Sequence, residues 1–127
     1  MIITSTLSNF LSNLKNHYIS KKTILKERKT KQIIQMLNLL IKEGLINGFY
    51  NFNNNYIIVL LKYNNNKGVI NCIKQISKPG KRVYVKNKWL YKNSKTDIFI
   101  LSTHKGLLTQ NQAKQYNLGG ELICKIN

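Results

Sequence analysis

Residues 98–116 read IFILSTHKGLLTQNQAKQY, and this stretch decides the fold of the second half of the chain. The apolar run 98–101 indicates a buried strand, because a short apolar run bounded by polar turn residues is typical of one. Residues 102–106 then form a tight polar loop. Thr109 and Gln112 have the spacing of a capping box, which predicts a short helix. The stretch therefore predicts strand, loop and helix in close succession.

Short strands separated by turns are also expected in the rest of the second half. These strands are predicted at residues 69–76, 82–85 and 122–126. Ser77-Lys78-Pro79-Gly80 contains a Pro-Gly turn signal, and residues 86–95 are expected to form a polar, basic loop. Gly119-Gly120 leads into the last strand.

The first half has helical periodicity in two segments. Apolar residues recur at helical spacing in 7–18 and again in 33–41. Thr30 is a candidate N-cap for the second helix, and Gly44 is placed to end it. Strands are expected at residues 23–25, 46–52 and 56–63. Asparagine triplets tolerate left-handed backbone, so they are expected to form turns.

Together these elements predict an α+β fold of two small packed domains. Residues 1–66 are expected to form a helix-rich α/β domain. Residues 67–127 are expected to form a mainly antiparallel β domain with one short helix. The polar, turn-forming segment Asn64 to Gly68 is the predicted junction.

The charge of the chain points to a polyanionic partner. There are 21 Lys and Arg residues and 4 Asp and Glu residues, a formal net charge of +17. Self-repulsion at this charge opposes a compact state, and nucleic acid relieves it by counterion release. Membrane-surface proteins concentrate their charge on one amphipathic helix, whereas lysines here run from Lys15 to Lys125. No apolar run approaches a membrane span, so no membrane partner is expected.

The chain lacks the usual marks of an enzyme. Its carboxylates lie far apart in the sequence, at Glu27, Glu43, Asp97 and Glu121. The two histidines are not at metal-ligand spacing, and no glycine-rich phosphate loop precedes a helix. No catalytic residue, metal, cofactor or small-molecule substrate is therefore expected. An RNA-processing or nuclease-like enzyme is the alternative, and a thiol paired with His104 stays open.

Composition also bears on the compartment. Cys72 and Cys124 stand singly among apolar neighbours, so both are expected to be buried free thiols in a reducing compartment. The residues from Met1 resemble neither a secretory signal nor an arginine-rich transit peptide. Abundant Lys, Asn, Ile and Tyr share A/T-rich codons. We therefore expect an organelle-encoded protein, mitochondrial first and plastid second.

Two segments have the residue types of RNA contacts. Ser102 to Gly106 combines hydroxyls, an imidazole, a cation and a glycine, which suit 2′-OH groups, base edges and phosphates. Composition alone leaves an ordinary turn equally open. In Ser77 to Tyr84, the cations Lys78 and Arg82 beside Tyr84 suit phosphate and stacking contacts. A protein interface is equally allowed there.

At these segments the sequence resembles the family of small-subunit ribosomal protein eight, of bacterial and organelle type. The carrying segments are Ile76-Ser77-Lys78-Pro79-Gly80, Arg82-Val83-Tyr84, Ile100-Leu101-Ser102-Thr103, Lys105-Gly106, Ala113-Lys114 and Gly119-Gly120-Glu121. Looser matches in the first half are Thr30-Lys31, Glu43-Gly44-Leu45-Ile46 and Leu61-Lys62-Tyr63. The resemblance covers nearly the whole chain and is most specific in the second half.

The resemblance implies a structural protein that binds an irregular helix of the central domain of small-subunit ribosomal RNA and supports assembly of the platform. Neighbouring small-subunit ribosomal proteins are the other implied partners. Carried over by position, the RNA-binding residues are Thr30, Lys31, Tyr84, Ser102, Thr103, Lys105, Gly106 and Glu121. The composition of the two segments adds Lys78, Arg82 and His104 to the expected RNA-binding residues. Among them, Ser102 to Gly106 read the RNA minor groove, Tyr84 and Glu121 flank this surface, and Thr30-Lys31 touch phosphates.

The sequence departs from the family pattern at two positions. His104 stands where members usually have a second serine, which puts one hydroxyl contact in doubt. Asp97 stands near a usual glycine. A translational repressor that acts outside the ribosome is a further alternative, because it would use the same RNA surface.

Overall fold

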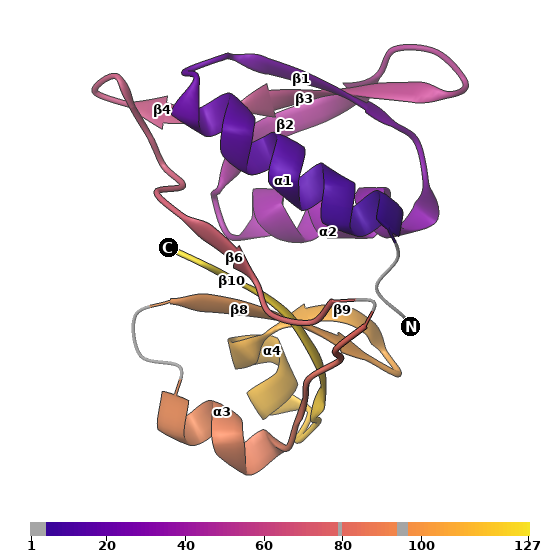
Figure 1. Ribbon diagram of the computed structural model, residues 1–127, viewed down its shortest axis with the longest axis vertical. Helices are drawn as coiled ribbons and strands as arrows, with labels where there is room; N and C mark the ends of the chain where they lie inside the picture. The colour runs from indigo at the N-terminus through magenta and orange to yellow at the C-terminus, as the bar shows by residue number, and fades with distance from the viewer. Residues whose placement is uncertain (1–4, 79, 94–96) are drawn as a thin grey trace. The chain divides into compact units, whose positions relative to one another are not determined.

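The chain has an α+β fold in the computed structural model, which describes residues 5–78, 80–93 and 97–127 (Figure 1). It forms two compact units. The N-terminal unit contains residues 9–71, and the C-terminal unit contains residues 5–8 and 72–127. The predicted domain boundary after residue 66 stays a prediction. The expected junction itself forms a small hairpin in the N-terminal unit, with positive φ at Asn65 and Asn66.

The N-terminal unit combines helices with a three-stranded antiparallel sheet of order β1-β3-β2. Its elements are α1 (Ser5–Ile19), β1 (Ile24–Arg28), α2 (Lys31–Lys42), β2 (Ile46–Asn51), β3 (Tyr56–Leu61), β4 (Tyr63–Asn64) and β5 (Lys67–Gly68). Residues 5–8 of α1 are the part of this helix that is grouped with the C-terminal unit. The buried apolar faces of α1 and α2 confirm the helical periodicity of the sequence.

Both ends of α2 form as predicted. The Thr30 hydroxyl accepts a hydrogen bond from the backbone N–H of Ile33 at 3.2 Å. Gly44 follows the C-terminal end with φ +74°, a conformation that glycine adopts at little cost. Tyr18 of α1 donates to the Leu45 carbonyl at 2.7 Å, which ties that helix to the chain after α2. Burial raises the pKa of the Tyr18 hydroxyl, so it remains a donor.

The C-terminal unit is built around its last strand. Its elements are β6 (Ile73–Gln75), β7 (Tyr84–Val85), α3 (Asn87–Asn93), β8 (Ile98–Thr103), β9 (Gly106–Thr109), α4 (Gln110–Gln115) and β10 (Gly120–Ile126). The antiparallel sheet has the order β6-β10-β8-β9, and β7 also pairs with β10. The buried side chains of Leu90, Phe99, Leu101, Ala113 and Leu122 form its core.

The capping box before α4 is confirmed. The Gln112 backbone N–H donates to the Thr109 hydroxyl, and the Thr109 backbone N–H donates to the Gln112 side chain. The expectation of a single helix in this unit is wrong, because α3 forms within the predicted basic loop 86–95. Burial of Leu90 and an edge contact between Trp89 and Phe99 stabilise this helix. Tertiary packing therefore forms a helix here despite the weak helix propensity of the segment.

Several predicted strand limits also need correction. The expected strand 69–76 is reduced to β6, and the expected strand 82–85 to β7. The strand predicted at 23–25 begins at Ile24 and continues to Arg28, and β9 was not predicted. Pairing partners set these limits, and the partners lie far away in sequence. Pro79 of the predicted Pro-Gly turn lies outside the described residues.

The expected burial of both thiols is half right. Cys124 is buried in β10, where it pairs with β6 and β8. Cys72 is exposed, because it precedes β6 and contributes its backbone, through hydrogen bonds with Asn127, rather than its side chain. Apolar neighbours in sequence therefore did not predict the environment of Cys72.

Candidate nucleic-acid interface

The predicted polar loop 102–106 is a tight hairpin turn between β8 and β9. Thr103 pairs with Gly106, so His104 and Lys105 are the two turn residues, and both are exposed. The Thr103 hydroxyl donates to the Gly106 carbonyl at 3.0 Å and accepts from the Lys105 N–H at 3.1 Å. Gly106 has φ +102°, which side-chain-bearing residues rarely adopt. Thr103 thus closes the turn that presents His104 and Lys105.

Four predicted or neighbouring residues form one row across the sheet. Tyr84 of β7 pairs with Glu121 of β10, which pairs with Ser102 of β8, which in turn pairs with Leu107 of β9. Directly paired residues point to the same face of a sheet, so the side chains of this cross-strand row share one face. Tyr84 is 69% exposed, whereas Ser102 is buried. The pairing joins three predicted site residues that lie up to 37 positions apart in sequence.

An ion pair fixes the middle of the cross-strand row. The Arg82 Nη1 donates to the Glu121 Oε2 at 2.9 Å, and Glu121 is only 2% exposed. A charge-assisted hydrogen bond offsets the cost of burying this carboxylate. Arg82 and Glu121 therefore hold each other, and Arg82 sits next to the exposed Tyr84. The two charges of the pair cancel, so its part in the row is to hold these side chains in position.

Two glycines let β10 approach its neighbours closely. A Cβ at Gly120 would lie 2.3 Å from the Ser102 carbonyl oxygen. A Cβ at Gly119 would lie 2.4 Å from the Val85 carbonyl oxygen. Both carbonyl oxygens are backbone atoms, so no side-chain rotation could relieve the steric clash. The Gly119-Gly120-Glu121 segment is therefore required for the register that places Glu121 beside Ser102.

The predicted motif around Ser77 is also structural in part. Ser77 is fully buried, and its hydroxyl accepts from the Val83 N–H at 2.9 Å. Lys78 and Lys81 form an isolated antiparallel bridge, with both backbone hydrogen bonds at 2.9 Å. The segment after β6 is thus folded back on itself, and the exposed lysine side chains stand on the turn.

Sequence reasoning missed aromatic residues that lie next to the predicted cations. The Lys105 Nζ lies 4.3 Å from the ring centroid of Tyr116, which is half exposed at the end of α4. In the same unit the Lys114 Nζ lies 5.2 Å from the ring centroid of the exposed Tyr91. Such cation–π pairs hold a lysine over a flat apolar surface. No sequence spacing connects Lys105 with Tyr116, so only the fold could reveal the pair.

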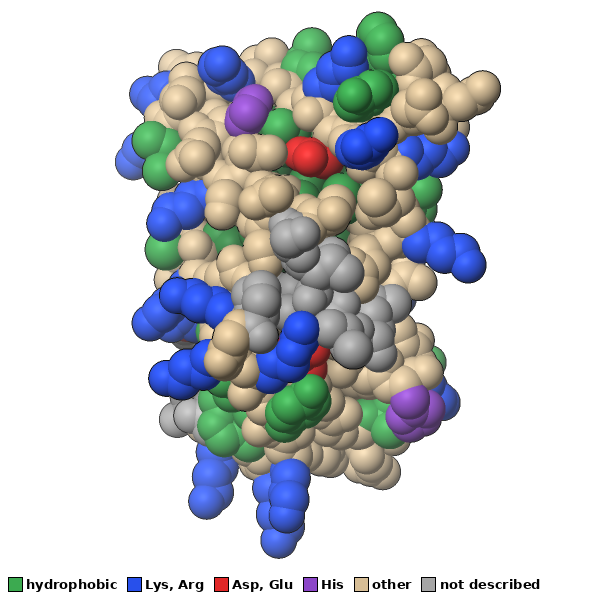
Figure 2. Space-filling view, turned by 45° about the vertical axis from the view of Figure 1, so that its right-hand side comes forward, with side chains coloured by type: hydrophobic (Ala, Val, Ile, Leu, Met, Phe, Trp, Pro, Cys, Tyr) green, Lys and Arg blue, Asp and Glu red, His purple; other side chains and the backbone are tan. Residues whose placement is uncertain are grey.

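The two predicted residues of the N-terminal unit lie at the start of α2. Thr30 is the N-cap, and Lys31 is the exposed first residue of the helix. Free N–H groups and the helix dipole favour anions at such an end. Figure 2 shows that lysine and arginine side chains are numerous on the visible face, whereas acidic ones are sparse. This distribution suits contacts with a phosphate backbone.

The described ranges contain no cluster of three or more His, Cys, Asp or Glu side chains that could hold a metal ion. Within the same ranges, no helix has both the length and the apolar character needed to cross a membrane.

Comparison with known proteins places the chain in the class of small-subunit ribosomal proteins. The sequence model described as Ribosomal protein S8 matches residues 5–127. A protein named small ribosomal subunit protein uS8m, from Acanthamoeba castellanii, is 39% identical over 97% of this chain and 99% of its own length. The uS8c protein of Chlorella vulgaris is 38% identical over 98% and 99%, and the uS8 protein of Blochmanniella pennsylvanica 36% over the whole of both chains.

The chain belongs to the ribosomal protein S8 family. The family resemblance inferred from the sequence is thereby confirmed. Members of this family are structural, non-enzymatic components of the ribosome, so the nuclease-like alternative does not hold.

Proposed function

We propose that this chain binds an irregular, internally looped helix in the central domain of small-subunit ribosomal RNA. The observation that carries the proposal is the cross-strand row, which brings Tyr84, Glu121 and Ser102 beside the turn at His104-Lys105. In RNA, an irregular helix exposes base edges and 2′-OH groups that a small protruding turn can reach. The site is therefore a shape-reading surface rather than a simple cationic patch.

The residues of this site divide into two roles. His104, Lys105, Tyr84 and the neighbouring Tyr116 are exposed, so they would contact RNA through charge, hydrogen bonds and stacking. Thr103, Ser102, Glu121, Arg82 and Gly106 would hold the turn and the row in place. Lys78 adds a cation on its own turn. Thr30 and Lys31 would hold a phosphate at the start of α2.

The wider role would be assembly of the platform of the small subunit beside neighbouring ribosomal proteins, in a mitochondrial ribosome. The relatives support an organelle or bacterial type of subunit, since their names carry the organelle forms uS8m and uS8c as well as uS8. The A/T-biased composition favours an organelle genome, with a plastid as second choice. Recovery of the protein with mitochondrial small subunits after cell fractionation would test this compartment.

The RNA site is tested with two conservative variants. Ser102→Ala and Thr103→Val each remove one hydroxyl, and each is expected to weaken binding by about 1–3 kcal/mol, or roughly 5- to 150-fold in Kd. The assay is a titration at fixed salt with a central-domain hairpin that contains an internal loop. Thr103→Ser keeps the hydroxyl and is the matched control.

The comparison RNA is a fully paired duplex of the same length. We expect clearly weaker binding to the duplex, because it lacks the irregular base edges. Unchanged affinity of both variants for the looped hairpin, with the fold intact by circular dichroism, would contradict the site assignment. Equal affinity for hairpin and duplex would contradict shape reading.

A further inference from the structure

A cavity of about 560 Å³ opens in the C-terminal unit, on the other face of the sheet from the cross-strand row. Val83, Val85 and Leu122 line it, and they flank or follow Tyr84 and Glu121 in sequence. Successive residues of a strand point to opposite faces, so the cavity and the row use opposite faces of β7 and β10. The proposed RNA-reading site therefore does not account for this cavity.

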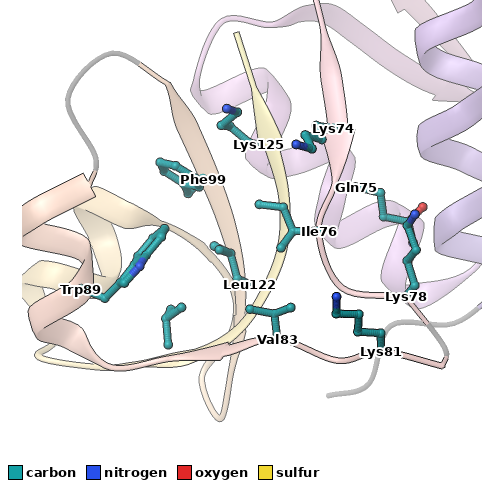
Figure 3. A pocket seen from close by; sticks show the side chains of 11 residues that line it. Lys74, Gln75, Ile76, Lys78, Lys81, Val83, Trp89, Phe99, Leu122 and Lys125 are labelled. Atoms are coloured by element: carbon teal, nitrogen blue, oxygen red, sulfur yellow. The ribbon is translucent and has the colours of Figure 1, made fainter.

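The floor of the cavity is apolar and partly aromatic. Figure 3 shows Trp89 of α3 and Phe99 of β8 on one side, with Ile76 and Leu122 between these rings and the side chains of Lys78 and Lys81. The ring centroids of Trp89 and Phe99 lie 5.3 Å apart with their planes at 81°. An edge-to-face pair of this kind makes a stiff apolar wall against which a flat ring can stack.

The rim consists of two cross-strand pairs of lysines. Lys74 of β6 and Lys125 of β10 are register partners. Lys78 and Lys81 are partners across the isolated bridge. Like charges placed directly opposite each other destabilise a sheet. Both pairs border the same cavity, so the folded chain concentrates repulsion there.

Little negative charge offsets this concentration. Among the described residues that form ion pairs, Asp97 reaches the rim, with its Oδ2 3.6 Å from the Lys125 Nζ. Both groups are partly exposed, so their attraction is weak. The remaining three rim lysines are exposed to solvent. An anionic ligand would relieve the repulsion that the fold imposes.

The rim lysines and the apolar floor of the cavity together favour one kind of ligand. Lys74 and Lys78 lie four residues apart along the chain, at most about 13 Å in extended backbone. A fitting ligand needs negative charges that recur over this distance and a flat apolar group between them. A single strand of RNA has phosphates at regular intervals and bases that stack on aromatic side chains.

We propose that this lysine-rimmed cavity binds a short single-stranded segment of RNA, with one base against Trp89 and flanking phosphates on the two lysine pairs. The proposal rests on the proposed function in that both partners are RNA and in that Lys78 contributes a cation to both. The cross-strand row and the cavity are otherwise separate, because they lie on opposite faces of the sheet. The cavity would thus bind an unpaired segment while the turn at His104-Lys105 binds an irregular helix.

Trp89 is the single tryptophan of the chain, so its fluorescence reports on the cavity directly. The full chain is titrated with hexa-adenylate and, in parallel, with an abasic hexamer of equal charge. We expect hexa-adenylate to quench Trp89 and the abasic hexamer to bind on the order of tenfold more weakly, because it cannot stack. Equal binding of the two probes, or no quenching by hexa-adenylate, would overturn the proposal.

Charge variants test the rim. Lys74→Gln with Lys81→Gln removes one member of each pair and leaves the contact between Lys125 and Asp97 in place. The dependence of log K on log salt for hexa-adenylate should become shallower by about 1.4, or 0.7 for each lost phosphate contact on a single strand. Lys15→Gln with Lys22→Gln removes the same charge from exposed positions in the N-terminal unit and should leave the slope unchanged. Equal slopes for the two double variants would contradict the assignment.

Two further results separate this proposal from its alternatives. If the looped hairpin still binds while hexa-adenylate fails to quench Trp89, the cavity proposal fails and the proposed function stands. If hexa-adenylate quenches while Ser102→Ala and Thr103→Val leave hairpin binding intact, the cavity proposal stands and the turn assignment fails. Quenching by a hexapeptide of alternating glutamate and phenylalanine, without quenching by hexa-adenylate, would show a peptide site and overturn the proposal.

Discussion

The substitution Gly120→Ala should separate two strands that the RNA site needs together. The added Cβ would lie 2.3 Å from the Ser102 carbonyl oxygen and 3.1 Å from the Ser102 carbonyl carbon. Both are backbone atoms, so β10 has to move away from β8. Overpacking of this kind costs about 1–3 kcal/mol of the free energy of unfolding.

Gly80→Ala is the matched control in the same unit. No atom lies within 4 Å of a Cβ built at Gly80, and its φ is outside the left-handed region. Loss of unfolded-state entropy should then stabilise the chain by about 0.4–1 kcal/mol. The loss of unfolded-state entropy is the same for both variants, so they should differ by the overpacking cost, about 1–3 kcal/mol, although each adds one methyl group to one glycine.

Urea unfolding followed by Trp89 fluorescence measures this difference, because Trp89 lies in the same unit as both glycines. The looped hairpin should also bind Gly120→Ala more weakly, since the substitution shifts Glu121 relative to Ser102. A Gly120→Ala midpoint equal to or above that of Gly80→Ala would refute the close-approach argument. Full hairpin affinity in a destabilised Gly120→Ala would refute the link between strand register and RNA binding.

Two predictions concern charge and burial. Lys31→Ala should make the dependence of log Kd on log salt for the looped hairpin shallower by about one unit, because one phosphate contact is lost. An unchanged slope in a salt titration would show that Lys31 is not part of the interface. In the folded chain, Ellman's reagent should modify Cys72 near neutral pH and reach Cys124 only after unfolding in urea, because Cys72 is exposed and burial raises the pKa of the Cys124 thiol from 9.0 to about 12. The unfolded thiol ionises first as pH rises, so the stability contributed by burying neutral Cys124 is complete below pH 9 and is lost towards pH 12. Equal modification rates for the two thiols in the folded chain would show that Cys124 is accessible.

Local signals in the sequence determined both ends of α2 and the start of α4. The Thr30 cap, the Gly44 stop and the Thr109–Gln112 box each involve residues within a few positions of one another. Their hydrogen bonds depend on local backbone geometry, so the printed sequence is enough to predict them. The family resemblance was also visible in the sequence, and the family model matches residues 5–127.

The site itself depended on tertiary structure. Pairing of β7, β10 and β8 brings Tyr84, Glu121 and Ser102 into one row, and the distance between them in sequence hides this arrangement. The helix α3 forms in a segment that looked like a basic loop, because Leu90 is buried in the core. Burial and strand pairing depend on residues that are remote along the chain, so only the folded structure decides them.

The cavity shows most clearly which features follow from the sequence and which follow from strand pairing. The excess of lysine throughout the chain predicts a polyanionic partner. It does not predict where on the protein that partner binds. Register decides that Lys74 faces Lys125 and that Lys78 faces Lys81, around a floor that includes Trp89. The sequence alone determined the charge, both ends of α2 and the start of α4. Strand pairing decided where that charge is concentrated, because pairing joins residues that local chemistry does not connect.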